Sequence, residues 1–149
     1  MTILVSYVPR PEGRAALAKG IELAKRLQED LLVVNATTGA KSPSPGLFEV
    51  TTITMSADAN PEDDSVVSEA DARQIERELA ASGVNAQFLQ FSRGKTPVEE
   101  LDDLVASRRI TMLIIGLRRR SPVGKLFLGS VAQEILLSVS CPVLAVKAG

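Results

Sequence analysis

Short apolar runs alternate along the chain with segments in which apolar residues recur at spacings of three and four. Unbroken apolar runs are typical of strands buried on both faces, and the wider spacings are typical of helices that cover a core. The runs predict five strands, at residues 3–8, 31–36, 84–91, 110–115 and 142–146. The periodic segments predict a helix that begins at Pro11 and further helices at residues 65–82, 97–107 and 130–139.

This alternation predicts an α/β fold in a single domain over residues 1–149. Strands joined by helices pair in parallel, and right-handed crossovers place helices on both faces of an open, doubly wound sheet. We expect a five-stranded parallel sheet in the order 3-2-1-4-5. Ligands of such sheets bind beyond the carboxyl ends of the strands, where the strand order reverses. The segments after Val8, Ala36 and Gly116 are therefore the expected site.

One long segment, residues 37–64, differs from the rest because it is rich in Ser, Thr, Pro, Gly and Ala. A loop of this length inside a compact domain is usually functional or mobile. We expect it to become ordered when a ligand binds.

The composition excludes several classes of function. The chain has 17 basic and 18 acidic residues and a formal charge of -1, whereas general nucleic-acid binders are usually strongly basic. Without histidine it lacks an imidazole base, a Ser-His-Asp triad and a His-ligated metal. The single cysteine, Cys141, excludes an intramolecular disulfide and a CxxC motif. No other arrangement for turnover is evident, so we expect a binding protein rather than an enzyme.

The sequence also bears on location. No apolar run is long enough to cross a bilayer, and the opening MTILVSYV has neither a basic n-region nor a cleavage site. One tyrosine and four phenylalanines are too few for a platform that stacks single-stranded nucleic acid. We therefore expect a cytoplasmic protein with no membrane and no nucleic-acid partner.

The segment from Gly116 to Ser130, GLRRRSPVGKLFLGS, carries the strongest chemical signal. It leaves a predicted strand and enters a predicted helix, whose first N–H groups and dipole favour an anion. Three arginines and a lysine add positive charge, and the segment has no acidic residue. This pattern favours an anionic ligand, with phosphate groups the obvious case. Alternatively, Ser130 and Gln133 form only a capping box, and the arginines are solvated surface charge.

These residues resemble the universal stress protein family. Its ATP-binding members carry a G-2x-G-9x-G-[ST] motif between the fourth strand and the last helix. In this sequence Gly116 takes the first glycine position, Arg119 stands at the second, and Gly129 and Ser130 close the motif. The closing CPVLAVK and the opening ILVSYVPRPEGRAAL are also similar to the family's ends, so the resemblance covers essentially the whole chain. Many ATP-binding relatives have an aspartate just past the first strand, where this chain has Val8.

The resemblance implies an ATP site built from three parts of the chain. Backbone groups at the ends of the first two strands would bracket the adenine, at Tyr7, Val8, Pro9 and Ala36. The end of the fourth strand would lie under the ribose and the phosphates, at Gly116, Leu117 and Arg118. Arg119 departs from the family's glycine, and its guanidinium could compensate by pairing with a phosphate. The start of the last helix would bind the phosphates, at Gly129, Ser130 and Val131. A bound nucleotide would bring Mg²⁺ held mostly by phosphate oxygens and water.

The resemblance implies a protein that binds ATP or a related adenine nucleotide, hydrolyses it slowly at most, and passes its nucleotide state to a protein partner in stress response or signalling. A short apolar strand at the sheet edge, residues 142–146, invites pairing with its twin in a homodimer, which the resemblance also implies. The alternative is a nucleotide-independent homodimeric interaction module whose Arg-rich loop binds an acidic protein partner.

Overall fold

A computed structural model describes residues 1–36, 67–91, 97–119, 126–127 and 130–148. The predicted loop at residues 37–64 lies outside them. Five strands form one parallel sheet in the order β3-β2-β1-β4-β6. Their bounds are β1 Thr2–Ser6, β2 Asp30–Ala36, β3 Ala86–Phe91, β4 Ile110–Arg119 and β6 Val143–Lys147. The predicted five-stranded sheet and its strand order are confirmed.

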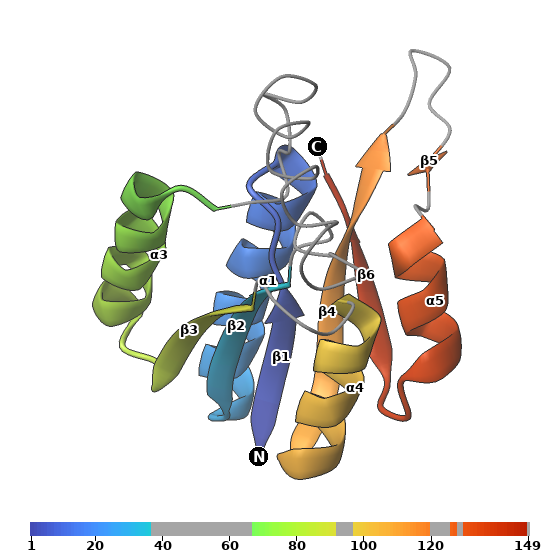
Figure 1. The fold of residues 1–149 in the computed structure, drawn as a ribbon. Coiled ribbons are helices and arrows are strands. Elements are labelled where there is room, and N and C mark those ends of the chain that lie inside the picture. Colours follow the sequence, from blue (N-terminus) through green and yellow to red (C-terminus); the bar gives the residue numbers. More distant parts are fainter. Residues whose placement is uncertain (37–66, 92–96, 120–125, 128–129, 149) are drawn as a thin grey trace, which may run out of the picture.

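Helices cover both faces of this sheet (Figure 1), as the doubly wound prediction requires. Helices α1 (Pro11–Leu27) and α3 (Glu69–Ser82) pack on one face, and α4 (Pro97–Ser107) and α5 (Ser130–Ser138) pack on the other. Because successive strand side chains point to opposite faces, neighbouring residues of one strand enter different cores. Ile3 and Val5 of β1 face α1, whereas Leu4 between them faces α4.

Helix α1 begins where the sequence predicts it. Pro11 occupies the first turn, where its missing N–H costs nothing, and Glu12 lies beside the positive end of the helix dipole. Three small buried residues, Ala16, Gly20 and Ala24, recur every fourth position and form a stripe that faces the sheet. Small side chains along this stripe let the helix lie close to the strands.

Helix α3 is shorter than predicted, because it begins at Glu69 rather than at residue 65. Ser68 has an extended backbone, and its hydroxyl oxygen accepts a hydrogen bond from the Asp71 N–H at 3.1 Å. Such a cap satisfies one of the free N–H groups of the first turn and fixes the helix start. The helix ends at Gly83, which has a φ of 76° and supplies the predicted stop.

The fourth strand is longer than predicted, because it does not end at residue 115. Strand β4 continues through Arg119, and a two-residue strand, β5 (Leu126–Phe127), pairs with its end in antiparallel fashion. Gly116 suggested a strand end, but a glycine inside a strand also marks the close approach of another backbone. In the structure Gly116 lies inside β4, where the backbone of α1 approaches it closely at Glu12. Strand β6 pairs with β4 as far as Leu117.

Candidate functional site

The strand order reverses between β1 and β4. The chain runs from β1 outward through β2 to β3, then returns to the other side of β1 to form β4 and β6. Parallel pairing of Val5 with Ile114 places the residues that follow β1 level with the end of β4. The segment Tyr7 to Pro9 and the residue Gly116 therefore meet at the carboxyl edge, where doubly wound sheets bind ligands.

Two glycines fix the first turn of α1 at this edge. A Cβ atom on Gly13 would lie 1.7 Å from the Val8 carbonyl oxygen, and one on Gly116 would lie 2.1 Å from the Glu12 carbonyl oxygen. Both distances are far below van der Waals contact, so each position requires glycine. The α1 backbone thus rests directly on the β1–α1 corner on one side and on β4 on the other. Gly116 has this packing role in addition to its predicted place under the ribose.

The backbone of the β1–α1 corner is already hydrogen-bonded within the chain. The Tyr7 N–H donates to the Val34 carbonyl at 2.8 Å, and the buried Asn35 amide donates to the Tyr7 carbonyl at 2.9 Å. The Arg10 N–H donates to the Val8 carbonyl at 2.8 Å, which closes a tight turn around Pro9. Each carbonyl oxygen keeps a second lone pair, so the corner offers acceptors and partly buried apolar surface to a ligand.

The aromatic ring of Tyr7 points into the protein. Its residue is 1% exposed, and its ring meets that of Phe88 edge-on, with centroids 6.5 Å apart and planes at 88°. The guanidinium carbon of Arg14 lies 5.7 Å from the centre of the Tyr7 ring. The ring is therefore unavailable to stack on a base, which leaves only the backbone of Tyr7 for contact with a ligand.

Burial raises the pKa of the Tyr7 phenol above its ordinary value of 10.0, against the opposing charge of Arg14; Asp71 and Glu78 raise it further. The unfolded chain then loses the phenolic proton at lower pH than the folded protein does. Stability should be unaffected below about pH 10 and should fall as the pH rises from there through the folded pKa. Because the chain has one tyrosine, phenolate absorbance reports Tyr7 alone, and its midpoint should drop on denaturation. A midpoint equal in both states would contradict this.

Ala36 ends β2 at the same carboxyl edge, opposite Phe91 of β3 in the parallel register. The end of β2 thus lies at the same edge as the segment that follows β1. Gly129 lies outside the described residues. Ser130 and Val131 open α5, whose first turn lies towards the carboxyl edge in Figure 1. Whether these residues hold a nucleotide stays a prediction.

The arginines of the predicted site lie in a strand rather than a loop. Arg118 and Arg119 pair with Phe127 and Leu126 in the antiparallel ladder. Among the described residues, positive φ angles occur at Gln28 and Gly83 alone. Arg119, at the second glycine position of the motif, consequently stands in an extended strand backbone.

A cavity of about 130 Å³ lies at the opposite, amino-terminal edge of the sheet, lined by Thr2, Asp30, Asn85 and Arg108 among others. Pockets that bury drug-sized ligands usually exceed 300 Å³. This cavity is too small for a nucleotide and is separated from the predicted site by the length of the strands.

Other chemistry has little support in the described part of the chain. Burial raises the pKa of the half-buried Cys141 thiol, which favours the protonated, less nucleophilic form. No group of three Asp, Glu or Cys residues gathers there closely enough to hold a metal ion. None of the described helices combines the length and the apolar character needed to cross a membrane.

Three residues around the β1–α1 corner were not predicted from the sequence. Asn35 gave a usable signal, because it is a polar residue inside the apolar run LLVVNA. A buried amide in such a strand needs a partner, and Tyr7 supplies one. Arg14 and Glu78 gave none, since they are 64 positions apart and each resembles an ordinary surface charge on a helix.

Known proteins resemble this chain over nearly its whole length. The model of the Universal stress protein family matches residues 1–147. A universal stress protein of Mycolicibacterium smegmatis (strain ATCC 700084 / mc(2)155) is 41% identical over 145 residues, which are 97% of this chain and 96% of the relative.

Two solved structures from Archaeoglobus fulgidus share the fold. One universal stress protein superposes with a TM-score of 0.67 at 20% identity, covering 98% of this chain and 97% of its own. A second, in complex with dAMP, superposes with a TM-score of 0.64 at 16% identity, covering 98% and 96%. At these identities the likeness concerns the fold alone.

Proposed function

The chain belongs to the universal stress protein family, and we propose that it binds an adenine nucleotide, ATP in particular, at the carboxyl edge between β1 and β4. The observation that carries this proposal is the meeting of the β1–α1 corner with the end of β4 at the reversal of the strand order. The dAMP complex of the Archaeoglobus fulgidus relative supports an adenine nucleotide as the ligand class.

Base and phosphates would contact different parts of this edge. The partly buried Val8 and Pro9 would give the adenine an apolar wall, with the backbone of Ala36 on its other side. The end of β4, with Arg118 and Arg119, would lie beside the phosphates, and charge-assisted hydrogen bonds to phosphate are stronger than neutral ones. The free N–H groups at the start of α5 would add to this attraction.

In the proposed function the protein binds a nucleotide and signals its presence, and it does not act as an enzyme. The chain has no histidine to activate water, so hydrolysis should be slow at most. The nucleotide state would be transmitted to a protein partner, and a homodimer would form through β6. Support for the dimer comes from β6 itself, which pairs with β4 on one side and with no other described strand on its second side.

Titration calorimetry with ATP and Mg²⁺ tests the site. Gly129→Val should abolish binding, because a branched side chain at the last glycine of the motif would block the backbone contact with phosphate that the family resemblance implies. The double change Arg118→Ala, Arg119→Ala should weaken binding and leave it measurable. If Gly129→Val bound ATP as tightly as the unaltered protein, the phosphates would lie elsewhere.

Light scattering of the same samples should give a dimer, and a monomer at micromolar concentration would contradict the β6 contact.

A further inference from the structure

Arg14 connects the β1–α1 corner to helix α3. It lies on the first turns of α1, and one guanidinium nitrogen, Nη1, is 2.9 Å from Glu78 Oε1 on α3. The same guanidinium faces the Tyr7 ring, with its central carbon 5.7 Å from the ring centre. One side chain therefore contacts both the neighbouring helix and the first residue past β1.

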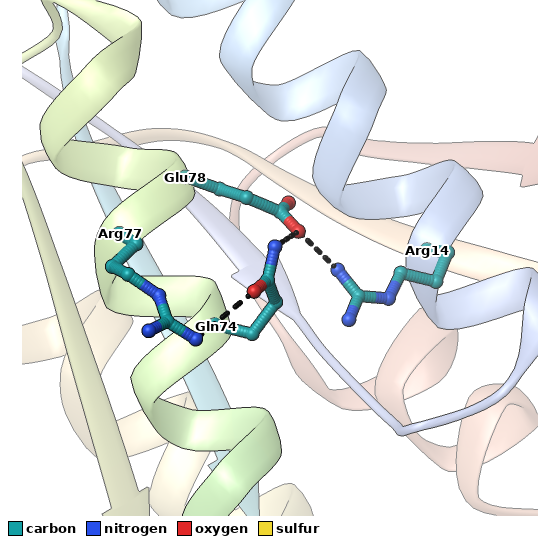
Figure 2. A network of polar contacts seen from close by, with 4 residues as sticks. All are labelled: Arg14, Gln74, Arg77 and Glu78. Carbon is teal, nitrogen blue, oxygen red and sulfur yellow. Dashed lines mark hydrogen bonds and ion pairs between the residues drawn. The ribbon is translucent and has the colours of Figure 1, made fainter.

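The contact with Glu78 belongs to a larger polar network on α3 (Figure 2). Glu78 Oε1 also accepts a hydrogen bond from Gln74 Nε2 at 3.1 Å, and Gln74 Oε1 accepts one from Arg77 at 3.1 Å. Figure 2 shows the Glu78 carboxylate reaching across to α1 between Gln74 and Arg14. Arg77 holds Gln74, and Gln74 in turn orients the Glu78 carboxylate, so the partner of Arg14 on α3 is fixed in place.

Tyr7 is buried and held by four contacts within the described part of the chain. Its backbone is tied to Val34 and to the Asn35 amide, and its ring is held between Phe88 and Arg14. Cation–π contacts depend on the position of the cation over the ring. A movement of the Arg14 guanidinium would therefore remove one of these two neighbours of the ring and shift the position of the ring, next to the backbone that leads into Val8 and Pro9.

We propose that Arg14 is a positioning residue of the nucleotide site: held by Glu78, its guanidinium fixes the Tyr7 ring and so sets the geometry of the β1–α1 corner against the base. This inference rests on the proposed function. It gives a role in nucleotide affinity to a side chain outside the predicted set of nucleotide contacts, and it makes α3 part of the site's support.

Nucleotide affinity and tyrosine titration test this role together. Arg14→Met keeps the apolar stem and removes the cation, so ATP binding should weaken roughly threefold to tenfold. The ionisation midpoint of Tyr7, the single tyrosine, should rise in the same variant, because Arg14 lowers the phenol pKa. Arg14→Lys keeps a cation near both partners and should recover most of the affinity. Glu78→Gln should weaken binding by a smaller factor, because it removes the charge that holds the guanidinium.

Arg73→Met is the matched control. Arg73 also pairs with a carboxylate, that of Glu69, but both lie on the exposed face of α3. Its loss should change neither ATP affinity nor the Tyr7 midpoint. A merely structural ion pair at Arg14 would lower the melting temperature and leave the affinity of the folded protein unchanged.

The outcomes separate this inference from the function on which it rests. An unaltered protein that binds no ATP overturns the proposed function, and the positioning role with it. An unaltered protein that binds ATP, with Arg14→Met binding equally tightly, overturns the positioning role alone. Weakened binding that Arg14→Lys recovers, together with a raised Tyr7 midpoint, supports it.

Discussion

Gly13→Ala is expected to destabilise the protein strongly, although Gly13 lies inside a helix where alanine is normally preferred. The helix propensity alone favours alanine by about 1 kcal/mol. Against this gain, the added Cβ would lie 1.7 Å from the Val8 carbonyl oxygen, a backbone atom that cannot rotate away. Overpacking of a well-packed contact costs about 1–3 kcal/mol or more. We expect a net loss of about 2 kcal/mol, which lowers the melting temperature of a chain of this size by roughly 5 °C or more.

Two further substitutions calibrate this result. Gly116→Ala should be similarly harmful, because its Cβ would lie 2.1 Å from the Glu12 carbonyl oxygen. Gly20→Ala is the milder control on the same helix, since its Cβ would meet a side-chain methyl of Val5 at 2.5 Å. The melting temperature of Gly20→Ala should therefore be higher than those of Gly13→Ala and Gly116→Ala. A Gly13→Ala protein as stable as the unaltered one would mean that α1 does not rest on the β1–α1 corner.

Asn35→Asp should destabilise the protein strongly, although it hardly changes the volume of the side chain. The Asn35 amide, 1% exposed, donates to the Tyr7 carbonyl at 2.9 Å, and a carboxylate would place an oxygen against that oxygen. Burying a carboxylate against a carbonyl oxygen costs about 3 kcal/mol or more, unless the group takes up a proton. The folded pKa of the new carboxyl should therefore rise above the unfolded value of about 3.9.

The sign of the pH dependence follows from this shift. When the folded pKa is raised, the folded state binds more protons, and stability falls as pH rises. The loss in free energy of unfolding, relative to the unaltered protein, should thus be smallest near pH 4. It should grow as the pH rises through the folded pKa of the new carboxyl. Urea unfolding at several pH values measures it. Asn85→Asp is the matched control, because the exposed Asn85 donates to Asp30 at 3.0 Å and its change should cost under about 1 kcal/mol. Equal deficits in the two variants would contradict the buried contact.

The order of the elements was predictable because local patterns determine it. Apolar runs, Pro11 at a helix start and Gly83 at a helix stop act within a few residues, and helix α4 occupies the predicted range of residues 97–107. Local reasoning failed where a distant strand supplies the partner. Strand β4 passes through Gly116 to Arg119 because β6 and β5 pair with it there, and a single segment carries no sign of those partners.

The site, too, has a part that the sequence predicts and a part that it does not. The carboxyl edge at Tyr7 and Gly116 follows from the sheet topology, which the sequence predicts. The contacts that hold this edge do not, because they join residues far apart: Arg14 with Glu78, Gly116 with Glu12, and Tyr7 with Asn35. The end of α1 at Gln28, with a φ of 57°, likewise has no glycine to mark it.

The most direct test of nucleotide binding is to denature the purified protein, identify any released small molecule by mass spectrometry, and titrate the ligand-free protein with ATP and Mg²⁺. We expect the protein to release a stoichiometric amount of an adenine nucleotide, or to bind ATP with a micromolar dissociation constant. In Gly129→Val this binding should disappear. A protein that releases no nucleotide and gives no heat up to millimolar ATP would contradict it. That result would favour the alternative, a family member whose Arg-rich segment binds an acidic protein partner.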